Sequence, residues 1–350
     1  MTQTEHRLGG NMKIIIDCLG GDNGARATVE GALAAMRKFD DLSVIFVGDE
    51  KEIGTILKEH EHTESRIDII HAPTMVDGND RPMEAVRMKR ESSMMRAIRE
   101  LRDREDIDGM VSVGATGCLI AGVTMMIPRI GGVRRPAFCP ILPTMTGGIV
   151  GICDSGANMV VSPEQLQQYA IMGSRYLRAA YKIENPRVAL LNVGKEEEKG
   201  DQLRLDAFKL LQNTPDLNFV GNMEARELLS GEIDLVVCDA FSGNVLVKSV
   251  EGTALELLKK IKKDIYSKSQ YKFGALFMKK MFMEEKEFMN YQNYGGSVFL
   301  GTEKTVVKGH GSADRKAIFV CISQARRMIR RHLTEEIGTA IEKSIPKDDE

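Results

Sequence analysis

Two glycine-containing turns in the sequence could bind an anion. Gly20, Gly21 and Asp22 follow one apolar run, and Thr116 and Gly117 follow another. A strand that ends in a glycine turn before a helix directs backbone N–H groups at the turn, and such turns bind phosphate or a developing oxyanion. The backbone N–H groups of these turns could therefore contact an anionic substrate, although Asp22 would repel a pyrophosphate and a structural turn alone would also explain the first glycines.

Polar residues also follow three further apolar runs. Asn158 and Lys199 each lie in a polar loop after such a run, and Asp239 and Asn244 lie together after the third. Ligands of open parallel sheets bind at the carboxyl ends of the strands. Five polar strand ends therefore predict one ligand crevice at a sheet edge.

His310 and Cys118 are two further candidates. His310 stands in a glycine-rich segment with Ser312, although a packed or solvated histidine is an alternative interpretation. Cys118, at an expected helix N-terminus, could act as an acyl-accepting nucleophile if its pKa were depressed, but a small buried residue explains it equally well. The sequence has no metal-ligand motif, P-loop or G-x-S-x-G elbow, so we expect no metal and no cofactor.

Alternating strand-like and helical segments must position these residues. The expected strands are at 13–17, 42–47, 67–71, 109–113, 149–153, 187–192, 219–221 and 235–238, and the expected helices are at 27–38, 83–104, 163–181, 203–212 and 250–267. Continuous apolar runs indicate strands that are covered on both faces. The sequence predicts an α/β fold, a three-layer α/β/α Rossmann-like and mostly parallel sheet with a helical hairpin extension.

Length and composition limit the classes of protein to which the chain can belong. The chain has 350 residues with 43% hydrophobic and 28% charged residues, which is typical of a folded globular protein. Its formal net charge of −2 provides no overall field to attract nucleic acid. Glycines and hydroxyl residues in the uncharged stretch 109–128 argue against a membrane span. Six cysteines without a C-x-x-C pair, and a polar N-terminus without a signal peptide, predict a cytoplasmic protein.

No linker or internal repeat divides the chain. We expect a disordered N-terminal extension at 1–11, a single domain at 12–335 that includes a helical hairpin at about 255–292, and a C-terminal tail at 336–350. Lysines that include Lys259 and Lys263 alternate with Met and Phe in this hairpin. Such a segment could meet an acidic protein or an anionic membrane surface, or it could be a lysine face over a core or dimer seam.

In their order and spacing, these loops resemble the bacterial phosphate acyltransferase family PlsX, from about Met12 to Arg330. The matching motifs are Asp-x-x-Gly-Gly-Asp at 17–22, Pro-x-x-Ala-x-Arg-x-Lys-x-x-Ser-Ser-Met at 82–94, Ser-x-Gly-x-Thr-Gly at 112–117, Asp-x-Gly-Ala-Asn at 154–158, Lys-Gly at 199–200, Gly-Asn-Val at 243–245 and His-Gly-Ser at 310–312. Ala115 departs from the family's usual Asn, which favours backbone N–H groups over side chains in that loop.

The resemblance implies reversible transfer of a fatty acyl group from acyl-carrier protein to inorganic phosphate, giving acyl phosphate for phospholipid synthesis. It implies catalytic roles for Lys199, which would bind phosphate, and for Asn244, which would orient phosphate or donate to the carbonyl oxygen. The implied substrate contacts are Gly20, Gly21, Asp22, Thr116, Gly117, Asn158, Asp239, His310 and Ser312. Phosphate would attack the thioester directly, without a protein nucleophile.

The resemblance also implies partners. The acidic carrier protein would dock on a basic region, either around Arg87, Lys89 and Arg90 or around Lys259 and Lys263. A homodimer, a downstream membrane acyltransferase, and peripheral contact with the inner face of the membrane are expected as well.

Three other functions remain open. A phosphotransacetylase-type enzyme would use an acyl-coenzyme A thioester instead. A nicotinamide-dependent dehydrogenase is suggested by the first glycine turn and Asp49, although the glycine spacing does not match. A non-catalytic membrane or carrier-protein scaffold would explain the lysine-rich segment alone.

Overall fold

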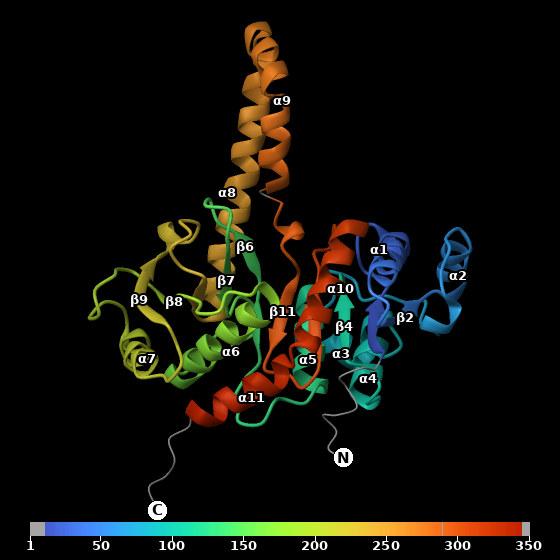
Figure 1. The fold of residues 1–350 in the computed structure, drawn as a ribbon, viewed down its shortest axis with the longest axis horizontal. Coiled ribbons are helices and arrows are strands. Elements are labelled where there is room, and N and C mark those ends of the chain that lie inside the picture. The colour runs from blue at the N-terminus through green and yellow to red at the C-terminus, as the bar shows by residue number, and fades with distance from the viewer. Residues whose placement is uncertain (1–10, 289, 345–350) are drawn as a thin grey trace, which may run out of the picture.

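The computed structural model describes residues 11–288 and 290–344, so residues 1–10 of the expected N-terminal extension and 345–350 of the expected tail lie outside the described residues. The predicted α/β class is confirmed, because mostly parallel strands are covered by helices on both faces. The strands form two sheets rather than one (Figure 1).

The first sheet has seven strands in the order β3-β2-β1-β4-β12-β11-β5. Their bounds are β1 Met12–Asp17, β2 Leu42–Gly48, β3 Ile67–His71, β4 Gly109–Ser112, β5 Ala137–Cys139, β11 Ser297–Leu300 and β12 Thr305–Lys308. The five strands from β3 to β12 are parallel, and β11 is antiparallel to both of its neighbours.

Helices cover both faces of this sheet because its strands are apolar on both sides. Ile14 and Ile16 of β1 join a core with α1 and α10, whereas Ile15 packs with α4 and α5. The helices of this half are α1 Gly24–Lys38, α2 Glu50–Lys58, α3 Pro82–Met88, α4 Ser93–Asp103, α5 Thr116–Met126 and α10 Arg315–Arg330. Alternation along one strand therefore separates two cores.

The second sheet has five strands in the order β6-β7-β10-β8-β9. Its strands are β6 Ile141–Pro143, β7 Ile149–Cys153, β8 Val188–Asn192, β9 Phe219–Glu224 and β10 Leu235–Val237. Its helices are α6 Pro163–Tyr181 and α7 Gln202–Gln212, together with α8 Ala240–Ser267, whose first turns cover the opposite face from α6. Only Pro140 separates β5 of the first sheet from β6 of the second, so the sheets meet at this point.

Three expectations about the elements are corrected. The helix expected at 83–104 is two helices, α3 and α4, separated by residues 89–92, where Ser92 adopts an extended conformation before α4. The strands β5, β6, β11 and β12 were not predicted. Residues 336–344 of the expected tail belong to α11 Leu333–Ser344, which folds because it buries Leu333, Ile337 and Ile341.

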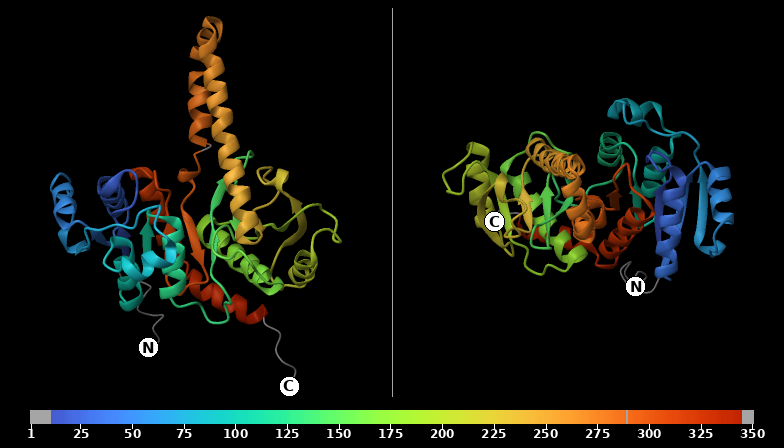
Figure 2. Two further views of the ribbon diagram at one scale, coloured as in Figure 1. Left: turned by 180° about the vertical axis from the view of Figure 1, so that it is seen from behind. Right: turned by 90° about the horizontal axis from the view of Figure 1, so that it is seen from above.

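A helical hairpin projects from the body of the molecule, as Figures 1 and 2 show from three directions. It consists of the distal part of α8 and of α9 Ser269–Phe288. α8 begins at residue 240, ten residues before the helix that the sequence predicted, and one face of its first turns is buried against the second sheet. Among the described residues, no helix combines the length and the apolar character needed to cross a membrane.

Candidate active site

A cavity of about 210 Å³ lies where the two sheets meet. One part of its wall is polar or charged and includes Thr116, Ser155, Asn244, Lys248, Lys308 and His310. Another part is apolar and is formed by Phe138, Pro140, Ile141, Leu142 and Val247. The cavity can therefore hold an anionic group close to a hydrocarbon chain.

The loops after β4 and β12 line one side of this cavity, and the loop after β1, with Gly20, Gly21 and Asp22, packs against them without lining it. The backbone N–H of Asp22 donates to the carbonyl oxygen of Gly311 at 2.8 Å. Gly20 has φ of 111°, and a Cβ at this residue would lie 2.9 Å from Gly114 Cα. This close approach requires glycine and holds the first turn against the loop that leads to Thr116.

Asp17 fixes the strand ends beneath these loops. Its buried carboxylate accepts hydrogen bonds from Ser93 Oγ at 2.6 Å and Ser112 Oγ at 2.7 Å. Burial raises the pKa of Asp17, although both hydroxyl bonds oppose this. The carboxylate joins β1, β4 and α4, so it positions the loops without lining the cavity itself.

On the second sheet, Asp154 organises the loop after β7. Its buried carboxylate accepts hydrogen bonds from the backbone N–H groups of Phe138 at 3.0 Å, Gly156 at 3.0 Å and Asn158 at 2.7 Å. Asn158 Nδ2 also donates to Asp154, at 2.8 Å, and to the Pro136 carbonyl. Asn158, expected to contact substrate, therefore uses its amide to hold this loop and is not among the residues that line the cavity.

Asn244 reaches the cavity from the first turns of α8. Its Nδ2 donates to the carbonyl oxygen of Ser155 at 3.1 Å. A Cβ at Gly243 would lie 2.1 Å from the Asp154 carbonyl oxygen, so glycine allows α8 to approach the loop. The amide of Asn244 is thus oriented on the cavity wall by a backbone acceptor.

Asp239 begins α8 as its N-cap, accepting a hydrogen bond from the Ser242 N–H at 2.9 Å. It also pairs with the Arg204 guanidinium. Burial would raise the pKa of Asp239, but the bonds from Ser242 and the charge of Arg204 lower it. Its carboxylate supports the helix that carries Asn244 and does not line the cavity.

Lys199 lies in the loop after β8, at the same edge of the second sheet as Asn244. It is exposed, and its carbonyl oxygen accepts a hydrogen bond from Asn192 Nδ2 at 3.0 Å. The described residues that line the cavity do not include Lys199. Its expected contact with phosphate remains a prediction.

His310 lines the cavity from the loop after β12. Its Nδ1 lies 2.8 Å from Ser312 Oγ, which accepts a hydrogen bond from Gln292 Nε2 at 3.1 Å. Burial and the neighbouring charge of Lys308 lower the pKa of His310 below its usual value of 6.5. We therefore expect a neutral imidazole near pH 7, with its ring orientation set by Ser312.

Lys308 is a charged cavity residue that the sequence analysis did not predict. It is the last residue of β12 and is 6% exposed. Burial lowers the pKa of its ammonium to about 8. The available signal was the lysine at the end of a short apolar run, directly before the glycine-histidine segment.

The interpretation of Cys118 as a nucleophile is wrong for this structure. Burial raises the pKa of its thiol, where the interpretation required a depressed pKa. Its Sγ lies 3.6 Å from the Asp80 carbonyl oxygen, and the residue does not line the cavity. Within residues 11–288 and 290–344, no three His, Cys, Asp or Glu side chains form a group that could hold a metal ion.

Asp49, the support for a dinucleotide-binding interpretation, caps a helix instead. Its carboxylate accepts hydrogen bonds from the backbone N–H groups of Lys51 at 2.8 Å and Glu52 at 3.2 Å at the start of α2. The side chain that would contact a ribose is therefore used within the fold.

The two basic regions lie on different parts of the molecule. Arg87 and Arg90 are exposed on and after α3, while Lys89 pairs with Asp80 at 2.5 Å. α3 adjoins the cavity loops, since a Cβ at Gly117 would lie 3.2 Å from Pro82 Cγ. The other region, with Lys259 and Lys263, is exposed on the projecting part of α8; Lys259 pairs with Glu256 at 2.7 Å.

Comparison with known proteins places these features among enzymes of acyl transfer. A family model described as fatty acid synthesis protein matches residues 12–336. The chain is 42% identical over 332 residues to the phosphate acyltransferase of Bacillus cereus, covering 95% of this chain and 99% of that protein. It is 41% identical over 331 residues to the phosphate acyltransferase of Shouchella clausii, with the same coverage.

Solved structures of similar fold include two phosphotransacetylases. The enzyme from Streptococcus pyogenes superposes with a TM-score of 0.57 at 16% identity, covering 98% of this chain and all of that one (100%). The EutD phosphotransacetylase from Staphylococcus aureus gives a TM-score of 0.54 at 14% identity, covering 97% of this chain and 96% of that chain. At these identities the likeness concerns the fold alone.

Proposed function

The chain belongs to the fatty acid synthesis protein family, whose matched relatives are phosphate acyltransferases, and we propose that it transfers a fatty acyl group from acyl-carrier protein to inorganic phosphate. The protein is an acyltransferase by this membership. The observation that supports the proposed reaction is the cavity where the sheets meet, whose polar wall with Asn244 and His310 adjoins an apolar wall.

In the proposed reaction, a phosphate oxygen attacks the thioester carbonyl carbon. A carbon–oxygen bond forms, the carbon–sulfur bond breaks, and the carrier protein leaves as its thiolate, which is then protonated. Phosphate is already anionic at neutral pH, so positioning and oxyanion stabilisation contribute more than activation of a nucleophile. Asn244 would donate its amide N–H to the carbonyl oxygen or to phosphate, and Lys199 would offset the charge of phosphate.

Acyl phosphate formation is tested by incubating the protein with acyl-acyl-carrier protein and labelled phosphate. We expect a labelled product that is destroyed by hydroxylamine, and no acylated protein on the way to it. A parallel arm with acyl-coenzyme A tests the phosphotransacetylase alternative. Product from coenzyme A thioesters alone, or a trapped acyl-enzyme on the pathway, would reject the proposal.

We propose that the carrier protein docks on Arg87 and Arg90, because α3 adjoins the loop that carries Thr116. The double variant Arg87→Glu, Arg90→Glu should raise KM for acyl-carrier protein about tenfold at low salt and weaken its salt dependence, with little change in kcat. Lys259→Glu, Lys263→Glu tests the hairpin, and Arg102→Glu, exposed on α4, is a control for a single charge reversal outside both regions. A KM that responds to neither salt nor any of these changes would exclude docking by charge.

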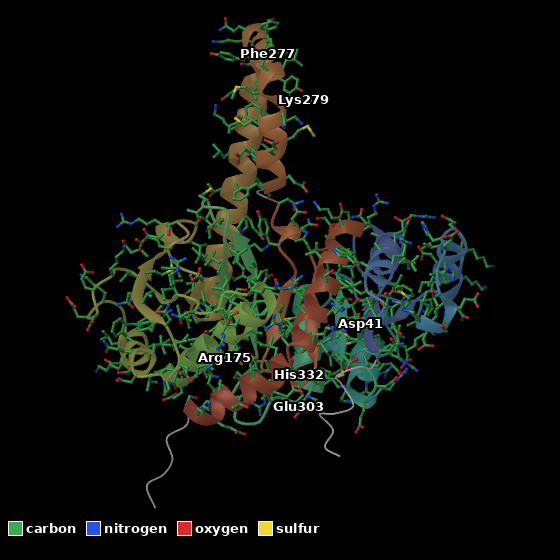
Figure 3. The ribbon with its side chains drawn as sticks, in the orientation of Figure 1. Asp41, Arg175, Phe277, Lys279, Glu303 and His332 are labelled. Carbon is green, nitrogen blue, oxygen red and sulfur yellow. The ribbon has the colours of Figure 1, made fainter. Side chains whose placement is uncertain are left out.

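We propose that the hairpin contacts an anionic membrane, which would place the enzyme at the inner membrane face, near a downstream membrane acyltransferase. Phe273 and Phe277 are 67% and 76% exposed on the projecting hairpin, where Figure 3 shows Phe277 and Lys279. We expect flotation with liposomes that contain anionic lipid, and loss of flotation in Phe273→Ser, Phe277→Ser.

A homodimer seam is the other proposed use of the hairpin. If these phenylalanines pack against a second copy, the same double variant should lower the molecular mass in solution by half, and flotation should not change. The two measurements therefore distinguish the two surfaces.

A further inference from the structure

We propose that the ammonium group of Lys308 binds the phosphate substrate within the cavity. This inference rests on the proposed acyl transfer to phosphate and adds to it a residue that its motifs did not include. Three observations support it: Lys308 lies in the cavity wall, its ammonium has no carboxylate partner among the described residues, and it is more buried than Lys199 and Lys248.

The position of Lys308 is set by the middle of the first sheet. β12 lies between β4 and β11, so its last residue opens into the cavity beside His310 and opposite Asn244 of the second sheet. Lys308 is 6% exposed. Its side chain is therefore enclosed by protein and faces the space that both sheets line.

In the described part of the chain the buried ammonium forms no ion pair with a carboxylate, although the charges of Asp17 and Asp22 act on it. Lys308 Nζ donates a hydrogen bond to the Gly309 carbonyl oxygen, which in the described part of the chain is its one hydrogen-bond partner. Asp17 is a buried acid whose charge acts on Lys308, but its two carboxylate oxygens accept hydrogen bonds from Ser93 and Ser112. A buried cation without a paired anion is unfavourable, and an anion that enters the cavity relieves this cost. Two N–H donors of the ammonium then remain for phosphate oxygens.

The other lysines at the site are less suited to this role. The side chain of Lys248, which also lines the cavity, is 64% exposed and pairs with Glu251 at 2.8 Å. Lys199 is exposed and outside the cavity wall. An enclosed ammonium interacts with phosphate in a less polar surrounding, where the attraction is stronger and less screened by salt.

This role predicts a specific pH dependence of phosphate binding. Burial lowers the pKa of Lys308 to about 8 in the free protein, so the ammonium loses its proton above that pH and phosphate affinity falls. Bound phosphate favours the charged form, so binding above that pH takes up a proton. The charged and titratable groups that face Lys308 are Asp17 of β1, Asp22 of the following loop, Lys248 and Glu251 of α8, His310, and Cys321 of α10.

The effect of Lys308 on the pH dependence of phosphate binding can be distinguished from the effects of these neighbouring groups. Burial raises the pKa of Cys321 to about 12, so its thiol stays neutral, and the lowered pKa of His310 keeps the imidazole neutral above pH 8. Phosphate itself is a dianion above about pH 8, so its own charge does not change there. Lys248 also lines the cavity, so the pH series is recorded for a variant that lacks Lys308 as well as for the wild type.

The test measures binding of inorganic phosphate to the full chain by equilibrium dialysis, with no acyl donor present. Lys308→Met keeps the length of the side chain and removes the charge, and Lys308→Arg keeps the charge. Lys304→Met is the matched control: Lys304 precedes the same strand at its opposite end, where its Nζ donates to the Ile107 carbonyl oxygen at 2.6 Å. Thermal unfolding is recorded for each variant.

We expect Lys308→Met to weaken phosphate binding about 10- to 100-fold and to raise KM for phosphate similarly, with KM for acyl-carrier protein unchanged. Lys308→Arg should recover part of the affinity, and Lys304→Met should bind as the wild type does. Removal of an unpaired buried charge should not lower the unfolding temperature. In the wild type, the phosphate dissociation constant should rise above about pH 8 and level off at about 10- to 100-fold its value at lower pH, and Lys308→Met should lose this rise.

Equal phosphate affinity in Lys308→Met and the wild type would overturn the inference. If Lys308→Met fails to fold, the wild-type pH series decides, and a flat dissociation constant between about pH 8 and about pH 10 would overturn it. These results differ from a failure of the proposed function, in which phosphate binds but no acyl phosphate forms.

Discussion

The Asn244→Ala variant should turn over about 10²- to 10³-fold more slowly than the wild type while folding normally, the cost typical of losing one oxyanion donor. Asn244 Nδ2 is held on the cavity wall by the Ser155 carbonyl oxygen, so its second N–H is available to the reacting groups. A donor fixed before the substrate arrives needs no reorganisation during the reaction. Alanine is favourable in a helix, so α8 should be unaffected.

The measurement is kcat with saturating phosphate and acyl-carrier protein, alongside circular dichroism and thermal unfolding. Ser249→Ala is the control, because Ser249 is exposed on the same helix and does not line the cavity. A kcat within about threefold of the wild type in Asn244→Ala would remove this residue from the reaction.

Lys199→Ala should also lower turnover by about 10²-fold or more, if Lys199 binds phosphate as the family resemblance implies. The loss should fall on kcat/KM for phosphate and much less on KM for the carrier protein. Because Lys199 is exposed and outside the cavity wall, an effect of this size requires the loop at 193–201 to reach the cavity when substrate is bound.

Lys195→Ala is the matched control for this loop. Its ammonium pairs with Glu227 on the surface, and exposed pairs contribute little. We expect near-normal turnover in this variant. If Lys199→Ala and Lys195→Ala are equally active, Lys199 has no role in the reaction, and Lys308 is left as the cation for phosphate.

The sequence predicted the class of the fold and part of the site for identifiable reasons. Long apolar runs such as 12–17 and 42–48 are strands that are covered on both faces, and their pattern is independent of distant contacts. The first glycine turn was predicted because its glycines stand between an apolar run and a helical segment, and Gly20 does lie close to the backbone of Gly114. Thr116, Asn244 and His310, named from such segments, do lie on one cavity wall.

The sequence analysis missed two kinds of feature. One is very short strands, and the other is polar residues whose types occur both in helix caps and in ligand sites. β5, β6, β11 and β12 each have three or four residues, too few for a periodic signal, so the division into two sheets and the position of Lys308 were missed. Asp and Asn serve helix caps and turns as readily as ligands. Asn158 and Asp239 were therefore predicted at the site, whereas the structure uses their side chains to support it.

α8 is one uninterrupted helix of 28 residues, about 42 Å from end to end. Asn244 belongs to its first turns and the projecting hairpin to its last, so both are parts of a single stiff rod that is anchored in the body near one end. A displacement of the distal end would tilt the whole helix and so move its first turns relative to the second sheet. A surface that binds the tip of the hairpin could therefore change how the Asn244 side chain is aligned with the substrate.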